Sequence, residues 1–206
     1  MGFYERVVFP WLNDLLVDHS GELKKLRLAT LASASGDVIE IGFGTGLSLP
    51  FYPKSVRSLT AVEPNEGMLA RAKERVAHSP FPMRVIHAPG ERLPLDDASF
   101  DTATLMLTLC SVDDPAAVLG EVRRVLRPGG RLLLLEHGLS PSPRLARWQH
   151  RLNPVENLLG AGCNLTRPTA ELVRRAGFRF EELREFHDPK MTKLVSWITT
   201  GVAVPE

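Results

Sequence analysis

The sequence predicts an α/β fold in which a mostly parallel sheet carries helices on both faces. Short β-branched or leucine-rich runs alternate with charged segments of helical length between residues 37 and 136. The run at residues 131–136 (RLLLLE) is apolar without alternation, as strands buried on both faces are. Strand and helix alternation of this kind indicates a parallel sheet. A chain of 206 residues can bury its core as one domain.

The first half of this pattern predicts four strands and a helix. Residues 37–41 are short and β-branched, and residues 59–62 (LTAV) predict the next strand. Residues 66–78 are rich in Ala, Leu, Lys, Glu and Arg, which favour a helix. Residues 83–87 predict a third strand. Residues 100–109 predict a fourth, whose few charges indicate cover on both faces.

The second half is predicted from its helix signals. Residues 115–126 form a helix, because Pro115 stands in the first turn and arginines near the end suit the helix dipole. Residues 127–130 (RPGG) predict a turn. Residues 138–164 contain helical pieces with weak periodicity. The fifth strand is predicted at residues 131–136, and a helix that stops at Gly177 at residues 168–176. Two closing strands are predicted at residues 178–186 and 194–204.

Composition excludes several classes of protein. The net charge is +1, from 25 basic and 24 acidic residues, which gives no electrostatic basis for binding nucleic acid. Cys110 and Cys163 do not make a disulfide framework, so a reducing, cytoplasmic setting is expected. No stretch approaches 18 uncharged apolar residues, so no transmembrane segment is expected. No metal site is expected, and the oligomeric state is left open.

The loop after the first strand is rich in glycine. Residues 38–49 read VIEIGFGTGLSL, with Gly42, Gly44 and Gly46 at alternate positions. A dinucleotide loop has the pattern G-x-G-x-x-G, which would put a glycine where Leu47 stands. Glu40 precedes the loop, and its carboxylate suits a ligand with an ammonium group better than a pyrophosphate.

A second acid completes this pattern. Glu63 follows the second predicted strand, about 20 residues after the loop, where an acid accepts hydrogen bonds from a ribose 2′-hydroxyl. The predicted ligand therefore has a ribose and a positive group, and no pyrophosphate. S-adenosylmethionine meets these three demands.

The assembled motifs resemble the class I S-adenosylmethionine-dependent methyltransferases, in the branch that includes the ubiquinone and menaquinone C-methyltransferases. The resemblance rests on residues 40–46, Glu63-Pro64, residues 90–101 and residues 126–130. It implies a Rossmann-like, seven-stranded, mostly parallel sheet with a reversed last strand. The cofactor-binding residues that it implies are Glu40, Gly42, Gly44, Gly46, Glu63, Pro64, Met68, Gly90, Glu91 and Leu107.

One position departs from that family. An Asp-Ala pair often precedes the Leu-Pro of the third motif, and its acid meets the adenine amino group. This chain has Ala88-Pro89-Gly90-Glu91 there. The adenine contact is therefore expected to shift to backbone groups near Ala88 and Gly90, or to Glu91.

A narrower resemblance concerns the thiol methyltransferases of animals and their bacterial relatives. It rests on residues 109–112 (LCSV), 135–137 (LEH) and 162–167 (GCNLTR). It implies methylation of a thiol sulfur. The animal proteins carry a hydrophobic membrane anchor before the domain, and none is expected here.

The resemblance also organises the chain. A single methyltransferase domain is expected over residues 1–206. Residues 1–35 form an N-terminal helical cap, residues 36–137 the cofactor-binding core, and residues 138–206 a substrate-side segment with the closing strands. The cap has a helical stripe of apolar residues that packs on the domain or covers a pocket.

Few side chains are candidates for handling the acceptor. His137 follows the fifth strand and is the predicted general base, since its unperturbed pKa lies near 6.5; the alternative is a histidine that caps the strand. Asp113 and Asp114 fit helix-start acids, and Cys110 a small buried residue. The cap and residues 138–164 are expected to close the acceptor pocket. Its predicted substrate residues are Tyr4, Trp11, Trp148, Asn164 and Arg167, with Phe9 and Leu158 as further lining.

The predicted function is S-adenosylmethionine-dependent methylation of a small molecule, and the narrower resemblance favours a thiol. C-, O- or N-methylation of a quinone precursor, a phenol or a lipid amine is the alternative on the same scaffold. Two more remote alternatives are an NAD-dependent oxidoreductase and a non-catalytic cofactor-binding module. Leu47 and Glu40 argue against the oxidoreductase.

Overall fold

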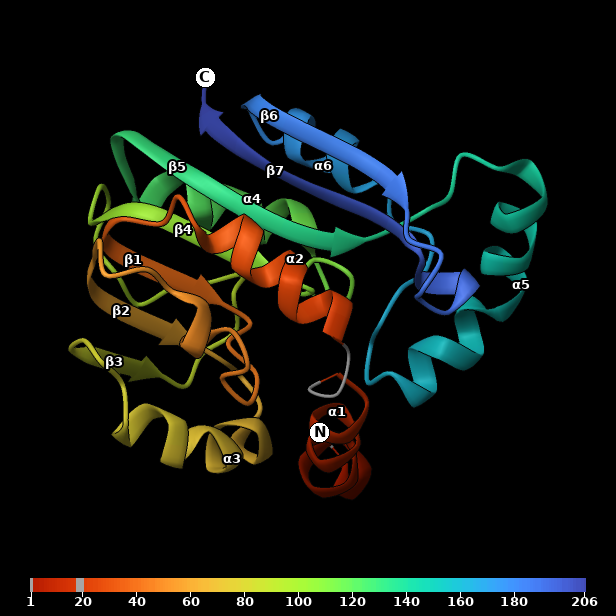
Figure 1. Ribbon diagram of the computed structural model, residues 1–206, viewed down its shortest axis with the longest axis horizontal. Helices are drawn as coiled ribbons and strands as arrows, with labels where there is room; N and C mark the ends of the chain where they lie inside the picture. The colour runs from red at the N-terminus through yellow and green to blue at the C-terminus, as the bar shows by residue number, and fades with distance from the viewer. Residues whose placement is uncertain (1, 18–20) are drawn as a thin grey trace.

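The fold is known from a computed structural model that describes residues 2–17 and 21–206. Seven strands form one sheet: β1 (Gly36–Ile41), β2 (Val56–Val62), β3 (Met83–Ile86), β4 (Phe100–Met106), β5 (Leu126–His137), β6 (Phe178–His187) and β7 (Trp197–Pro205). Their spatial order is β3-β2-β1-β4-β5-β7-β6 (Figure 1). Strands β1 to β5 pair in parallel, and β7 is antiparallel to both β5 and β6. The predicted seven-stranded sheet with a reversed last strand is confirmed.

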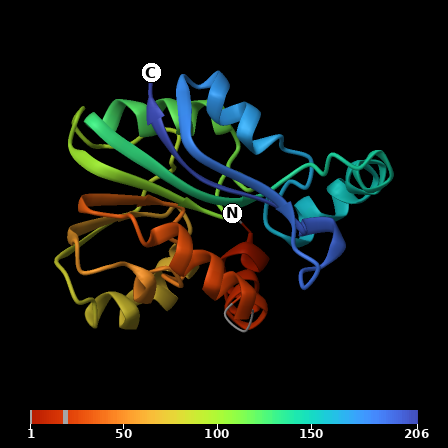
Figure 2. The same ribbon diagram turned by 45° about the horizontal axis from the view of Figure 1, so that its top comes forward.

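Helices cover both faces of this sheet. Helix α2 (Gly21–Leu31) and helix α3 (Glu66–Ala77) lie on one face, and α4 (Pro115–Val125) and α6 (Thr169–Arg175) on the other (Figure 2). The other helices are η1 (Tyr4–Val8), α1 (Phe9–Val17), α5 (Pro143–Leu159) and the short turns η2 (Leu49–Phe51) and η3 (Lys193–Val195).

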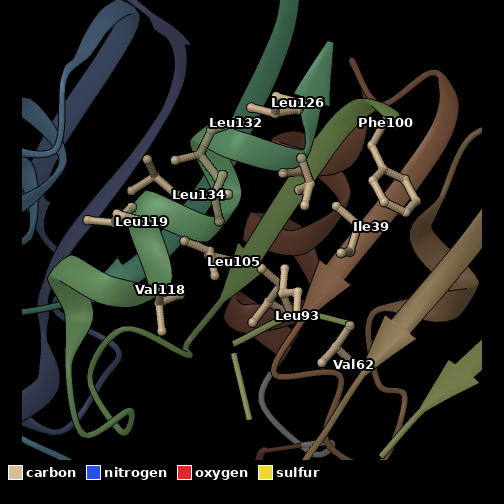
Figure 3. Packing of buried hydrophobic residues seen from close by; sticks show 14 of the residues in the cluster. Ile39, Val62, Leu93, Phe100, Leu105, Val118, Leu119, Leu126, Leu132 and Leu134 are labelled. Atoms are coloured by element: carbon tan, nitrogen blue, oxygen red, sulfur yellow. The ribbon is translucent and has the colours of Figure 1, made fainter. Parts of the chain in front are cut away.

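The core is two apolar layers that share the strands. Figure 3 shows Ile39 and Leu105 of the sheet in the layer that α4 covers with Val118 and Leu119. Successive leucines of β5 divide between the layers, with Leu132 and Leu134 in this one and Leu133 and Leu135 in the other. All four are fully buried. The unbroken apolar run of the sequence therefore marks a strand buried on both faces.

Two boundaries differ from the predicted ones. Strand β4 ends at Met106 instead of residue 109, because Leu107 adopts a positive φ of 63° and turns the chain. The predicted turn at residues 127–130 is an irregular start of β5, where Gly129 has φ 80° and the register against β4 shifts. The weakly periodic segment after β5 contains one 17-residue helix, α5, with Pro154 inside it.

The N-terminal segment packs over the start of α3. The Asn65 side-chain amide donates to the Glu5 carbonyl at 2.8 Å. Asp14 of α1 pairs with Arg71 of α3 at 2.8 Å and accepts a hydrogen bond from Thr45 at 2.5 Å. Figure 1 shows α1 and α5 beyond the carboxyl ends of the parallel strands. Within residues 2–17 and 21–206, no helix has both the length and the apolar character that a membrane span requires.

Candidate functional site

The carboxyl ends of β1, β2, β4 and β5 form the candidate site. In open parallel sheets ligands bind at this edge, where the strand order reverses. Here the order reverses between β1 and β4, which are adjacent although β2 and β3 separate them in the sequence. The glycine loop follows β1 directly, so it lies at the reversal point.

The glycine loop has a backbone that only glycine adopts readily. Gly42, Gly44 and Gly46 have φ values of +74°, +59° and +81°. A Cβ atom on Gly42 would lie 2.4 Å from the Thr108 side chain, and one on Gly46 would lie 2.9 Å from the Phe43 ring. A Cβ on Gly44 would meet no described atom within 4 Å. The first and third glycines therefore allow close packing, and Gly44 has open space beside its backbone.

Glu63 joins the end of β2 to this loop. Its carboxylate accepts hydrogen bonds from the Gly44 N–H at 2.8 Å and from the Asn65 N–H at 2.9 Å. The side chain is buried, and burial raises its pKa. A carboxylate has about four acceptor positions, so two are left for the hydroxyl groups of a ribose. The glycine loop and this carboxylate fit the ribose and backbone contacts that S-adenosylmethionine requires.

Glu40 lies beneath the loop, with 1% of its surface exposed. The Tyr52 hydroxyl donates to its carboxylate at 3.0 Å and lies 2.7 Å from the Thr104 hydroxyl. Burial raises the pKa of Glu40 to about 7, against hydrogen bonds from Ser48 and Tyr52 that lower it. A nearby positive group would favour the charged carboxylate, as expected for a site that takes an ammonium group.

The turn after β4 is strained and closely fitted to the loop. Leu107 keeps its positive φ while its N–H donates to the Leu135 carbonyl at 2.8 Å. The Thr108 hydroxyl donates to the Ile41 carbonyl at 3.0 Å, just before the glycine loop. Non-glycine residues in this conformation are found where the surrounding structure holds them, often at functional sites.

The residues predicted for the rest of the cofactor lie around the same edge. Gly90 is buried, and a Cβ there would lie 2.6 Å from the Ile41 side chain. The Glu91 carboxylate accepts hydrogen bonds from the N–H groups of Asp113 and Asp114, at 3.1 and 3.3 Å. Met68 is buried in the first turns of α3, and Pro64 is exposed beside Glu63.

Asp114 is the N-cap of α4. Its carboxylate accepts hydrogen bonds from the N–H groups of Ala116 and Ala117. The interpretation of Asp114 as a helix-start acid is therefore confirmed.

Glu136 organises the loop after β4 from within. It is completely buried, and its carboxylate accepts hydrogen bonds from the N–H groups of Thr108 and Leu109, at 2.6 and 2.8 Å. The N–H of Cys110 adds a longer one at 3.4 Å. Burial raises the pKa of Glu136 to about 8.

Next to this carboxylate, Cys110, His137 and Cys163 form a cluster. One ligating atom from each lies within 4.8 Å of the other two, and His137 Nε2 lies 3.2 Å from Cys163 Sγ. Cys110 and His137 are buried, and Cys163 is half-buried. The other ring nitrogen of His137, Nδ1, is buried without a hydrogen-bond partner among residues 2–17 and 21–206. We name these three residues the Cys-His-Cys cluster.

The cluster perturbs its own ionisation. The hydrogen bond with Cys163 is the main cause that lowers the pKa of Cys110, and the same contact raises that of Cys163. Burial acts to lower the pKa of His137, but the neighbouring Cys110 and Glu136 outweigh it and raise the pKa above its ordinary value. Such mutual perturbation is typical of functional sites.

Asn164 and Arg167 fix the loops that carry the cluster. The Asn164 N–H donates to the Cys110 carbonyl at 2.8 Å, and its side chain accepts from Thr166. The Arg167 guanidinium donates to the carbonyls of Leu109 and Val112. Both residues therefore hold the backbone beside the cluster, and their polar groups form hydrogen bonds with other residues of this chain.

The aromatic residues predicted for the acceptor lie on the cap and on α5. The Tyr4 hydroxyl donates to the Leu159 carbonyl at 2.5 Å, which connects the cap to the end of α5. Trp11 and Trp148 are about half exposed, and the latter lies among arginines of α5. Phe9 is half-buried near the Tyr4 ring, and Leu158 is exposed.

Some residues of the site were not singled out by the sequence. Tyr52 binds Glu40, and Asn65 caps α3 while it holds the cap through Glu5. The N-cap pattern of Asn65 before a helical segment is a signal that could have found it. The narrower resemblance includes the segments of both His137 and Cys163, but their distance in space depends on the path of α5 between them.

Comparison with known proteins gives a consistent result. A family model described as "Methyltransferase domain" matches residues 39–134. The human thiol S-methyltransferase TMT1B is 38% identical over 207 residues, which covers 94% of this chain and 82% of the relative. The human thiol S-methyltransferase TMT1A is 36% identical, covering 86% and 75%. The crystal structure of a SAM-dependent methyltransferase from Thermotoga maritima superposes with a TM-score of 0.68 at 27% identity, covering 97% of this chain and 95% of that one.

Proposed function

The chain is a methyltransferase of the family that contains these thiol S-methyltransferases, and from this membership we propose that it methylates the sulfur of a small thiol with S-adenosylmethionine. The observation that carries the thiol assignment is the extent of the similarity. The family model ends at residue 134, whereas the similarity to human TMT1B covers 94% of the chain. It therefore includes the acceptor side, with His137 and Cys163.

We assign the cofactor to the glycine loop and the two acids around it. When bound, S-adenosylmethionine supplies a methyl group on a positively charged sulfur. Glu63 would hold the ribose hydroxyls, Gly44 would let the ligand approach the backbone, and Glu40 would favour the ammonium group. Leu107, Gly90, Glu91, Met68 and Pro64 would form the remaining walls.

We assign the acceptor to the neighbouring Cys-His-Cys cluster. A thiol is a far better nucleophile as the thiolate, and free thiols ionise near pH 8.5. A site that promotes ionisation at neutral pH therefore accelerates the reaction, and His137 is the residue we assign to this task. Orientation of the two reactants is the larger contribution, because positioning alone can lower a barrier by about 7–11 kcal/mol.

The cap and α5 would enclose the acceptor. Tyr4, Trp11 and Trp148 provide large apolar surfaces with polar edges, which suit a small, partly apolar molecule. Asn164 and Arg167 would act by holding the loop that carries Cys110.

The deciding experiment combines cofactor binding with an acceptor screen. Calorimetry measures the affinity for S-adenosylhomocysteine, with NADH as the competing ligand. The purified chain is then given S-adenosylmethionine with 2-mercaptoethanol, thiophenol, phenol or a primary amine, and release of S-adenosylhomocysteine is measured.

We expect binding of S-adenosylhomocysteine, no binding of NADH, and turnover with the two thiols. Turnover with phenol or the amine alone would overturn the thiol assignment and keep the methyltransferase. Binding of S-adenosylhomocysteine without turnover of any acceptor would favour a non-catalytic module.

A further inference from the structure

We propose that the Cys-His-Cys cluster is a zinc site whose fourth ligand is the sulfur of the acceptor thiol. The inference rests on the proposed function, because it states how the acceptor is bound and ionised. It assigns a metal ion to three residues that lie in the three short segments of the narrower resemblance. Cys110 follows β4, His137 ends β5, and Cys163 follows α5.

The donor set is the first argument. Two thiolates and one imidazole are ligands that zinc prefers, and catalytic zinc sites have three protein ligands and one exchangeable position. Two thiolates also balance the charge of the dication, so the neutral imidazole adds none. With water in the fourth position, a buried group of this kind is electrically neutral, which lowers the cost of placing an ion away from water. The acceptor thiolate adds one negative charge, and its reaction with the positively charged sulfonium removes that charge again.

The spacing is the second argument. Zinc binds sulfur at about 2.3 Å and imidazole nitrogen at about 2.0–2.1 Å, so tetrahedral ligand atoms are about 3.5–3.8 Å apart. In the cluster His137 Nε2 lies 3.2 Å from Cys163 Sγ, and all three atoms lie within 4.8 Å of one another. A tetrahedral ion therefore needs side-chain shifts of less than about 1 Å.

The rigid setting of the ligands is the third argument. The backbone of Cys110 is held on one side by Glu136 and on the other by the Asn164 N–H. Arg167 fixes the carbonyls of Leu109 and Val112 around it. His137 belongs to a central strand, with its backbone paired to Ile198 of β7. Metal sites depend on such supporting contacts for their geometry.

The location explains what the ion would do. Thr108, two residues before Cys110, contacts the glycine loop at Gly42, so the cluster is next to the cofactor site. The acceptor R–SH would replace a water ligand and give its proton to solvent, leaving a zinc-bound thiolate. This sulfur then forms a bond to the methyl carbon while the carbon–sulfonium bond breaks, and the products are R–S–CH₃ and S-adenosylhomocysteine. His137 acts here as a metal ligand, and the zinc ion promotes the ionisation of the thiol in place of the ring as a base.

Metal content tests the site without reference to activity. The full chain, without an affinity tag and reduced with tris(2-carboxyethyl)phosphine, is titrated with zinc and analysed by elemental mass spectrometry after gel filtration. We expect one zinc ion per chain. The variants Cys110→Ser, Cys163→Ser and His137→Gln should lose most of it, whereas His150→Gln, at an exposed position of α5, should retain it. Circular dichroism verifies that each variant is folded.

Cobalt substitution tests the fourth ligand. Co²⁺ in place of zinc should show the visible absorption of tetrahedral thiolate-bound cobalt. Addition of 2-mercaptoethanol should shift these bands, and its S-methylated product, 2-(methylthio)ethanol, should not. A shift without methylation of any thiol would support the site and overturn the proposed function.

Three outcomes would overturn the inference and leave the proposed function intact. One is thiol methylation by a reduced chain that binds no zinc, which would return His137 to the role of a base. Another is zinc bound equally by wild type and by Cys163→Ser. The third is a cobalt spectrum that 2-mercaptoethanol does not change, which would reject the acceptor as fourth ligand.

Discussion

The carboxylate of Glu63 accepts a 2.8 Å hydrogen bond from the backbone N–H of Gly44. This bond fixes the glycine loop against the end of β2. The same carboxylate retains acceptor positions for a ribose. In the proposed function, one side chain therefore shapes the loop and would bind the ribose.

Replacing Glu63 should weaken cofactor binding more than it weakens the fold. In Glu63→Gln one carboxylate oxygen becomes an amide NH₂, which cannot accept a hydrogen bond. Hydrogen bonds to charged groups contribute about 1.5–3 kcal/mol, so the Kd for S-adenosylhomocysteine should rise about ten- to a hundredfold. Calorimetry measures it, with Glu66→Gln as a control at an exposed position three residues along the chain. Equal affinities in both variants would contradict the assignment.

Gly44 and Gly129 allow backbone strain to be separated from ligand contact. Both have positive φ, and an added Cβ would meet no described atom within 4 Å at either position. Gly44→Ala and Gly129→Ala should therefore lose similar stability, about 1–2 kcal/mol. Only Gly44→Ala should also lose affinity for S-adenosylhomocysteine, because only Gly44 belongs to the loop. Thermal unfolding and calorimetry on both variants provide the comparison.

Glu40 should make the stability of the protein depend on pH. Burial raises its pKa from the ordinary 4.5 to about 7, so the folded state holds a proton that the unfolded state has released. The contribution of this proton to the free energy of unfolding is fully present below about pH 4.5. It is lost as the pH rises toward 7, by up to about 1.4 kcal/mol per pH unit.

The variant Glu40→Gln should lack this contribution. As the pH rises from 4.5 to 7, the unfolding free energy of wild type should therefore fall relative to that of Glu40→Gln. Urea unfolding across this range measures it. Parallel curves for the two proteins would show that Glu40 has an ordinary pKa.

His137→Gln should affect turnover and leave the cofactor in place. The proposed function assigns His137 to the acceptor side of the site, so we expect kcat for a thiol to fall by about a hundredfold or more. The Kd for S-adenosylhomocysteine should change less than about twofold. Steady-state kinetics and calorimetry are compared with His150→Gln. Undiminished turnover would remove His137 from the mechanism.

Asp14 should control how firmly the cap is held. It pairs with Arg71 and bonds Thr45 of the glycine loop. Partly exposed ion pairs contribute about 1 kcal/mol or less, so Asp14→Asn should increase amide exchange in residues 2–17 up to about fivefold. Hydrogen-exchange mass spectrometry measures it, and the exposed Asp96→Asn is the control. Unchanged exchange would show that apolar packing alone holds the cap.

The fold could be predicted almost completely because its signals are local. The β-branched run before Gly42 and the leucines of residues 132–135 mark strands through composition alone. The errors occurred where a single backbone angle decides the boundary. Nothing in the residue type of Leu107 indicates a positive φ, because the hydrogen bond to Leu135 and the packing of Thr108 impose it.

The candidate site divides in the same way. The glycines and Glu63 are near one another in sequence, and their spacing indicated a shared ligand. The proximity of Cys110, His137 and Cys163 in space depends on the path of the chain through α5. Sequence periodicity does not specify this path. The position of Glu40 before the loop indicates its role, but its partner Tyr52 becomes apparent only when β1, β4 and η2 are packed together.

The position of β7 has a consequence for how this chain is made. β7 is the last strand in the sequence, yet it lies between β5 and β6. During synthesis the ribosome releases β5 long before β7, so the edge of β5 that pairs with β7 is without a partner until β7 is made. Unpaired edges of this kind recruit other chains. A stop codon before residue 197 should therefore produce aggregates during expression, even though every residue of the glycine loop and of the Cys-His-Cys cluster would already be present.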